Sequence, residues 1–141
     1  MNGRNRRSWP EAALLLAFNI AEYRSEDPYI QVGATAMKHD GTIILGYNGA
    51  PTGVDIDWAD RDERRKRVLH AETNVLNNCV PGEIKLMAVT HLPCPECIKS
   101  IAQKKIKTVY YCKTLSSYDN ALTFTLAKEF GIELILIDRV D

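Results

Sequence analysis

Between residues 85 and 112 the chain alternates a strand pattern, a helix pattern and a second strand pattern. KLMAVTH (85–91) and TVYYC (108–112) are short runs rich in β-branched and aromatic residues, and a helical pattern runs from Pro95 to Lys105. Two strands joined by a helix form a βαβ unit, in which the strands are parallel and the crossover is right-handed. Because apolar residues dominate both runs, we expect helices to bury these strands on both faces of a sheet.

The rest of the chain extends this unit into one layered domain. Ser8 begins a helix that runs to Tyr23, and Asp40 and Gly41 form a hairpin turn between two strands. The predicted strands cover residues 32–37, 42–47, 85–91, 108–112 and 132–137, and further helices cover 70–78 and 121–130. Neither a repeat nor a linker interrupts this order. We therefore expect residues 1–141 to form a single α/β domain of three layers, α/β/α, around a mixed sheet of about five strands.

The charge balance argues against nucleic acid as a partner. The chain has 18 basic and 18 acidic residues and no net charge at neutral pH, whereas proteins that bind nucleic acid usually carry a basic excess. ERRKR (63–67) looks like a basic patch, but residues 55–67 hold five acidic and five basic side chains. We interpret this segment as a solvated loop or helix face, and we expect a small-molecule partner.

Features of the N-terminal region and of the cysteines indicate a cytoplasmic protein. RNRR (4–7) before AALLLAF (12–18) resembles a secretory signal, but Glu11 interrupts it and forms a capping box with Ser8. No apolar run approaches the length of about 20 residues that spans a bilayer. We expect no membrane association, and we expect the four cysteines to lie in a reducing compartment, where C-x-x-C indicates metal or redox chemistry.

Three residues have the chemistry of a catalytic zinc site. Cys94 and Cys97 begin one predicted helix, and His70 begins another. Unpaired N–H groups and the positive end of the helix dipole stabilise thiolates at such a position. Zinc prefers thiolate sulfur and imidazole nitrogen, and a catalytic site has three protein ligands and one water. If the two helices lie side by side, these residues converge on one metal ion.

Glu72 distinguishes a catalytic site from a structural one. It follows His70 by two residues, a spacing that puts both on one helical face only if the first turn bends them inward. A carboxylate beside a metal-activated water can accept its proton and pass it on. The alternative is a closed structural site in which His91 is the fourth ligand, and that site leaves Glu72 without a role.

These motifs resemble a known family. HAE (70–72) followed by PCPEC (93–97) is similar to the H-x-E and P-C-x-x-C motifs of zinc-dependent nucleoside and nucleotide deaminases. RSEDPYIQVGA (24–34), GYNGAPTG (46–53) and the layout of residues 118–137 resemble deoxycytidylate (dCMP) deaminases in particular. The resemblance spans nearly the whole chain and implies a cytidine-deaminase-like fold.

The resemblance also implies an activity and residue roles. It implies hydrolytic deamination of dCMP to dUMP and ammonia, which feeds dTMP synthesis, with Zn²⁺ bound by His70, Cys94 and Cys97 and with Glu72 as the proton shuttle. Asn48 would contact the sugar, although asparagine before glycine also supports turns. Arg24 would bind the phosphate, although an arginine at a helix C-terminus also favours the dipole. Many members are homo-hexamers that dCTP activates and dTTP inhibits.

Other deaminases share the same zinc motifs. A dCTP-tolerant enzyme, a cytidine or cytosine deaminase and a tRNA adenosine deaminase are the alternatives. An enzyme that acts on a base within RNA needs a surface for the extruded base and its neighbours, usually with basic flanks. The balanced charge and the GYNGAPTG loop favour dCMP over RNA.

Overall fold

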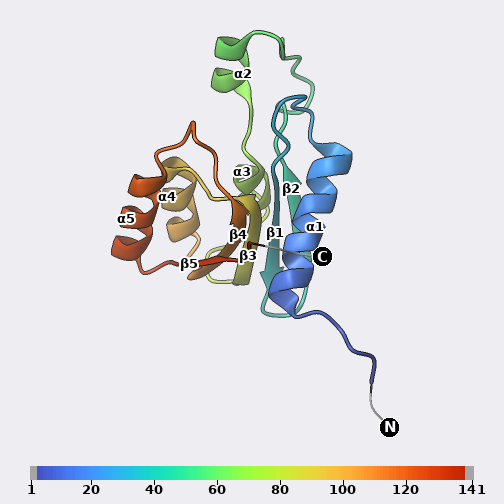
Figure 1. Ribbon diagram of the computed structural model, residues 1–141, viewed down its shortest axis with the longest axis vertical. Coiled ribbons are helices and arrows are strands. Elements are labelled where there is room, and N and C mark those ends of the chain that lie inside the picture. The colour runs from blue at the N-terminus through green and yellow to red at the C-terminus, as the bar shows by residue number, and fades with distance from the viewer. Residues whose placement is uncertain (1–2, 139–141) are drawn as a thin grey trace.

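A computed structural model describes residues 3–138 of the protein. The chain forms five helices and five strands within these residues (Figure 1). They are α1 (Trp9–Arg24), β1 (Gly33–Lys38), β2 (Ile43–Tyr47), α2 (Arg61–Arg67), α3 (Ala71–Leu76), β3 (Ile84–His91), α4 (Pro95–Gln103), β4 (Thr108–Lys113), α5 (Asn120–Phe130) and β5 (Glu133–Leu136).

The strands form one mixed sheet in the order β2-β1-β3-β4-β5. β1 pairs antiparallel with both β2 and β3, while β3, β4 and β5 run parallel to one another. The antiparallel pair β1–β2 is a hairpin, and Gly41 in its turn has a φ of 90°, which favours glycine. The helices α4 and α5 make the two parallel crossovers. The predicted mixed sheet of five strands is confirmed.

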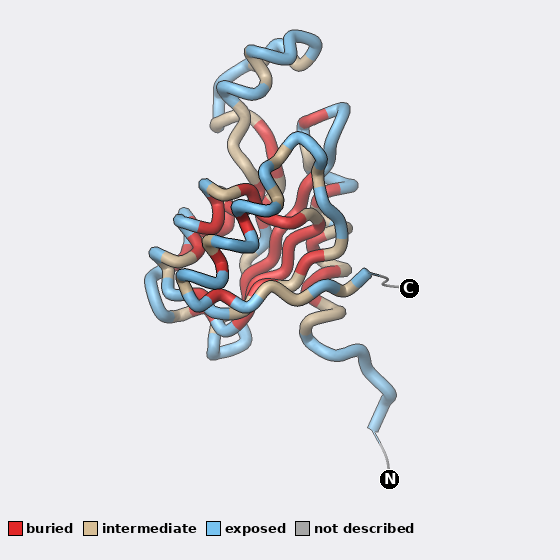
Figure 2. The backbone as a smooth tube through the Cα atoms, turned by 60° about the vertical axis from the view of Figure 1, so that its left-hand side comes forward, coloured by how far each residue is buried: buried red, intermediate tan, exposed pale blue. Residues whose placement is uncertain are grey.

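Helices cover both faces of the sheet, so the fold has three layers (Figure 1). α1 packs on one face, where Leu14 and Ala13 lie against Met37 and Leu86. α3, α4 and α5 cover the other face with a larger apolar cluster. β3 lies between both clusters and is buried along most of its length (Figure 2).

The termini of two helices explain where they begin. Ser8 Oγ accepts a hydrogen bond from the Glu11 backbone N–H, as the capping-box pattern predicts. α2 lies in the segment that we interpret from the sequence as a solvated loop or helix face. Asp60 Oδ1 accepts a hydrogen bond from the Glu63 N–H and caps this helix. α2 has no buried residue and lies beyond the end of the sheet (Figure 1).

The structure contains no helix, among residues 3–138, that combines the length and the apolarity needed to cross a bilayer.

Candidate active site

His70 is the residue that precedes α3, and its backbone is extended rather than helical (φ −73°, ψ 152°). Backbone hydrogen bonds between Leu69 and Gly49, of 2.8 and 3.1 Å, hold the chain just before it. Glu72 is then the second residue of the helix. The short spacing between His70 and Glu72 is therefore not a helical spacing, and both side chains reach the same cavity.

Cys94 and Cys97 come from the start of α4, which follows β3. Cys94 is the N-terminal cap, Pro95 occupies the first helical position, and Cys97 lies in the first turn. Proline is favoured at that position because its missing N–H would be unpaired there anyway. Neither His70 nor Cys94 caps its helix through its side chain, so the side chains are free to act as ligands.

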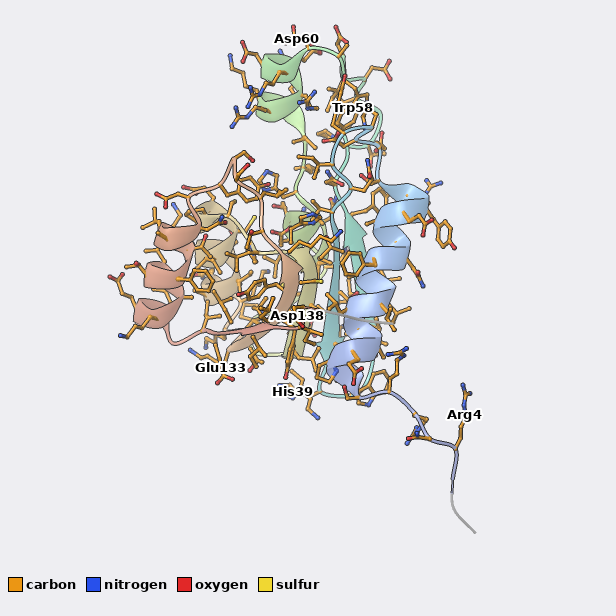
Figure 3. The ribbon with its side chains drawn as sticks, viewed as in Figure 1. Arg4, His39, Trp58, Asp60, Glu133 and Asp138 are labelled. Atoms are coloured by element: carbon orange, nitrogen blue, oxygen red, sulfur yellow. The ribbon has the colours of Figure 1, made fainter. Side chains whose placement is uncertain are left out.

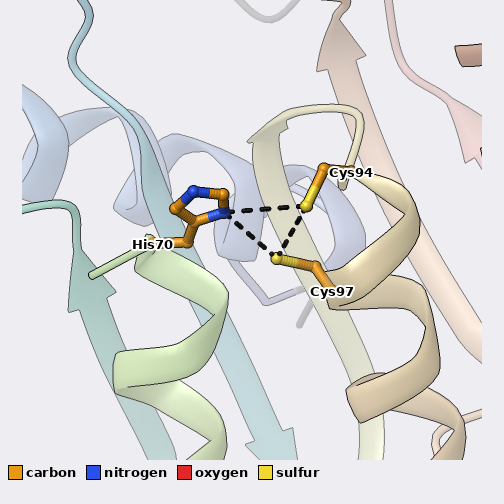
Figure 4. Close-up of side chains that lie close together, drawn as sticks. All are labelled: His70, Cys94 and Cys97. Atoms are coloured by element: carbon orange, nitrogen blue, oxygen red, sulfur yellow. Dashed lines mark hydrogen bonds between the residues drawn. The ribbon is translucent and has the colours of Figure 1, made fainter. Parts of the chain in front are cut away.

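The three predicted ligands converge at one point (Figure 4). His70 Nδ1 lies 3.4 Å from Cys97 Sγ and 3.7 Å from Cys94 Sγ, and the two sulfurs are 3.4 Å apart. Ligands at 2.0–2.3 Å from a tetrahedral zinc ion lie roughly 3.5 Å from each other. The donor set, one imidazole nitrogen and two sulfurs, fits zinc in both chemistry and spacing.

The pKa values of the two cysteines shift in opposite directions. The hydrogen bond from Cys97, together with that from His70, lowers the pKa of Cys94 to about 4. The pKa of Cys97 is raised instead, because its hydrogen bond to Cys94 and its burial both favour the neutral thiol. The hydrogen bond with Cys94 also raises the pKa of His70. The lowered pKa of Cys94 favours the thiolate, which is the form of cysteine that binds metal.

Glu72 is buried beside this cluster, with 3% of its surface exposed. Burial raises the pKa of its carboxyl group, and the nearby His70 partly offsets this effect. A carboxyl group whose pKa is raised toward neutrality can both accept and donate a proton near neutral pH. Its position suits a proton shuttle.

The cluster opens onto a cavity of about 330 Å³. His70 and Glu72 line this cavity, and Tyr118 lies beside His70 with the two rings stacked at 6.0 Å between centroids. Sequence reasoning did not single out Tyr118, because it lies in the loop before α5 and the resemblance of residues 118–137 concerns their layout rather than this side chain. It also missed three arginines of α2 that line the same cavity, Arg61, Arg64 and Arg65.

His91 lines the cavity but is not part of the metal cluster. Thr90 Oγ1 accepts a hydrogen bond from the Gly33 N–H at 3.1 Å and lies 2.8 Å from His91 Nδ1. The hydrogen bond between this hydroxyl and Nδ1 holds the imidazole ring in one orientation. Burial lowers the pKa of His91 to about 4, so the ring is neutral at pH 7. This arrangement disfavours the closed site with His91 as the fourth ligand.

Asn48 is buried in the loop after β2 and also lines the cavity. Its Oδ1 accepts from the Val32 N–H at 3.0 Å and from the Ser25 hydroxyl, and its Nδ2 donates to the Ile30 carbonyl at 2.8 Å. These bonds join β2 to the segment after α1. The second N–H of the amide has no protein acceptor within residues 3–138 and remains available to a ligand.

Arg24 lies at the C-terminal end of α1. Its guanidinium is 6.0 Å from the centre of the Tyr47 ring, and it is not among the residues that line the cavity. The structure therefore brings Asn48, His70, Glu72, Cys94 and Cys97 together and leaves Arg24 apart from them.

Residues 7–113 match the family model of the cytidine and deoxycytidylate deaminase zinc-binding region. The chain belongs to this family. The matched residues include His70, Glu72, Cys94 and Cys97. The resemblance that the motifs indicated is thus confirmed, and zinc is the metal that the family description and the donor set both indicate.

Individual proteins are similar to this chain over most of its length. ComE operon protein 2 of Bacillus subtilis (strain 168) is 36% identical over 144 residues, which cover 96% of this chain and 75% of that protein. The deoxycytidylate deaminase of Homo sapiens is 38% identical over 114 residues, covering 73% of this chain and 64% of the human enzyme. This chain thus spans less than two thirds of the human relative.

A solved structure extends this similarity to three dimensions. The crystal structure of the dCMP deaminase from cyanophage S-TIM5 in complex with dCMP and dUMP has a TM-score of 0.76 and 30% sequence identity to this chain. The match covers 90% of this chain and 95% of the phage chain. The cytidine-deaminase-like fold predicted from the sequence is confirmed.

Proposed function

We propose that this deaminase hydrolyses dCMP to dUMP and ammonia, a reaction that supplies the precursor of dTMP. The observation that carries the proposal is the convergence of His70 Nδ1 with two cysteine sulfurs, beside a cavity that His70 and the buried Glu72 line. The human and phage relatives named for this activity support the substrate.

His70, Cys94 and Cys97 would hold the zinc ion, and a bound zinc ion makes water nucleophilic at neutral pH. The Glu72 carboxylate would take a proton from the attacking water and deliver it to N3 of the cytosine. Water adds at C4, the C4–N bond breaks, and the amino group leaves as ammonia after it receives the second proton. Each turnover consumes one water and regenerates the carboxylate.

The cavity walls would orient the substrate. The free N–H of Asn48 can donate to a sugar hydroxyl, while its other bonds keep the amide in place. The neutral His91 lines the same cavity, and its hydrogen bond to Thr90 fixes the orientation of the ring. A phosphate contact by Arg24 stays a prediction from the resemblance.

The resemblance also supports a homo-hexamer in the cytoplasm with dCTP as activator and dTTP as inhibitor. We include these properties in the proposal. Light scattering on the purified protein measures the assembly, and rates of dCMP turnover with either triphosphate measure regulation.

The substrate is tested by ammonia release from dCMP, dCTP, deoxycytidine and a tRNA, with zinc content determined on the same preparation. We expect activity on dCMP with one zinc ion per chain. Activity on dCTP as well would show that the cavity accepts a longer phosphate chain. Activity on tRNA alone would show that the substrate is a base within RNA rather than dCMP. Bound zinc without any turnover would favour a structural metal site.

A further inference from the structure

The segment between β2 and α3 is neutral in sequence, but the structure separates its charges in space. α2 itself has five basic and two acidic residues and no buried side chain. It lies beyond the sheet, and Asp60 is at its outer end (Figure 3). A helix without buried side chains contributes little to the stability of the core. We therefore ask whether the side chains of α2 have a functional role.

The carboxylates of this segment bond to backbone N–H groups rather than to arginines. Asp57 Oδ1 accepts from the Ala59 N–H at 3.1 Å, and Asp60 Oδ1 accepts from the Glu63 N–H at 3.1 Å. Glu63 Oε1 accepts from the Asp57 N–H at 3.2 Å. The three carboxylates lie within 4.8 Å of one another. Three of the five acidic side chains of the segment therefore bond to its own backbone.

The arginines of the same segment line the cavity instead. Arg61, Arg64 and Arg65 all belong to its wall, and none of them forms an ion pair within residues 3–138. Arg64 is fixed, because its Nη1 donates to the Trp58 carbonyl at 2.9 Å and its guanidinium lies 4.3 Å from the centre of the Tyr29 ring. Arg61 and Arg65 are exposed and have no side-chain partner there.

Arg65 and Tyr118 line the same cavity. Tyr118 in turn stacks on His70. The wall of one cavity therefore holds His70 of the metal cluster, the buried carboxyl groups of Glu72 and Asp27, and three guanidinium groups. Such a cavity fits a ligand with a neutral planar group at one end and an anionic group at the other.

We propose that Arg61, Arg64 and Arg65 of α2 bind the 5′-phosphate of the substrate and select nucleotides over nucleosides. The proposal rests on the proposed function, which places the cytosine at Glu72 and thereby directs the phosphate toward the mouth of the cavity. Guanidinium groups suit this role because they make paired, charge-assisted hydrogen bonds to phosphate oxygens. Arg24, the candidate from the resemblance, does not line this cavity.

The test compares two double variants of the same helix. R61A/R65A removes two cavity-lining charges, and K66A/R67A removes two charges that lie outside the cavity wall. All four side chains are exposed, so both variants should fold. We expect R61A/R65A to lower kcat/KM for dCMP about 100-fold, mainly through KM, and to change deoxycytidine turnover by less than about twofold. K66A/R67A should resemble the wild type.

Binding of the product provides a readout that does not require turnover. Calorimetry should show that R61A/R65A weakens dUMP binding about 100-fold and leaves deoxyuridine binding unchanged. If wild-type protein with bound zinc does not deaminate dCMP, the proposed function is wrong, and the dUMP titration still decides the arginine proposal. If dCMP is deaminated and R61A/R65A behaves like K66A/R67A, the arginine proposal is wrong. If R24A is the only variant that selectively loses dCMP turnover, Arg24 of α1 binds the phosphate instead.

Discussion

His70 and Glu72 lie two residues apart and differ in backbone conformation. His70 keeps an extended backbone before α3, whereas Glu72 belongs to the helix. This change of backbone conformation brings an imidazole and a carboxyl group to the same cavity from positions two residues apart. A continuous helix would place them on different faces.

The substitution Glu72→Gln tests the proton shuttle. Glutamine has nearly the same shape but cannot accept and release a proton, so we expect turnover of dCMP to fall by at least about 100-fold while zinc is retained. Ammonia release and zinc content measure both properties. Glu96→Gln is the matched control, because Glu96 lies in the PCPEC motif but its side chain is 80% exposed and pairs with Lys99. An active Glu72→Gln enzyme would exclude the shuttle role.

The buried His91 makes the free energy of unfolding depend on pH. Its pKa of about 4 in the folded protein lies below the ordinary value of 6.5, because burial disfavours the charged ring. The unfolded chain therefore binds a proton before the folded one does, and His91 destabilises the fold as pH falls from about 6.5 toward 4. Above pH 7 this effect is absent.

We expect His91→Gln to lose less stability than the wild type between pH 7 and pH 5. Urea unfolding at several pH values measures the free energy of unfolding for both proteins. Exposed His39 provides the control, since His39→Gln should follow the wild type. An identical pH dependence of His91→Gln and wild type would show that the ring is not held neutral.

Gly33 of β1 lies so close to α1 that the contact has no room for a side chain at this position. A Cβ atom added at Gly33 would lie 1.9 Å from the backbone oxygen of Ala17, and this oxygen cannot move without shifting the helix. Gly33 also donates its N–H to Thr90, which orients His91. The close approach of helix and strand thus links the packing of the domain to the cavity wall.

Gly33→Ala should therefore destabilise the protein by about 3 kcal/mol or more, the upper end of the usual cost of overpacking. Chemical denaturation gives the difference in the free energy of unfolding. Gly3→Ala is the control, because no atom lies within 4 Å of the added Cβ there. A loss below about 0.5 kcal/mol for Gly33→Ala would mean that α1 can move away at little cost.

The strands and helices of this domain could be predicted because their patterns are local. The βαβ unit at 85–112 and the hairpin at Asp40-Gly41 both occur as expected. The separation of charge around α2 could not be predicted, since the alternating signs of residues 55–67 average to zero along the chain. In the structure three of the carboxylates bond to backbone N–H groups, whereas three arginines line the cavity.

The complete molecule explains why the zinc motif is split between two distant segments. α3 follows the β1–β2 hairpin, whereas α4 follows β3, yet β3 pairs with β1 in the centre of the sheet. Both helices pack on the same face, so their N-terminal ends meet above it (Figure 4). The motif spacing in the sequence reflects this topology, and the convergence of the ligands follows from it.

The same arrangement limits what the sequence could establish about the site. His70, Cys94, Cys97 and Glu72 are recognisable because their residue types are specific to metal and proton chemistry. Tyr118 and the α2 arginines belong to loops and a short helix, where residue type alone does not distinguish a cavity wall from solvent-exposed surface. Their positions depend on how the whole chain folds around the cavity.

Turnover of dCMP in ¹⁸O-labelled water examines the hydrolytic centre as a whole. Zinc-loaded wild-type protein should form dUMP that contains one oxygen from the solvent, with one ammonia released for each dUMP. Removal of zinc by a chelator should abolish this product, and zinc added back should restore it. Zinc-loaded protein that forms no dUMP, or dUMP without solvent oxygen, would contradict hydrolytic deamination at His70, Cys94, Cys97 and Glu72.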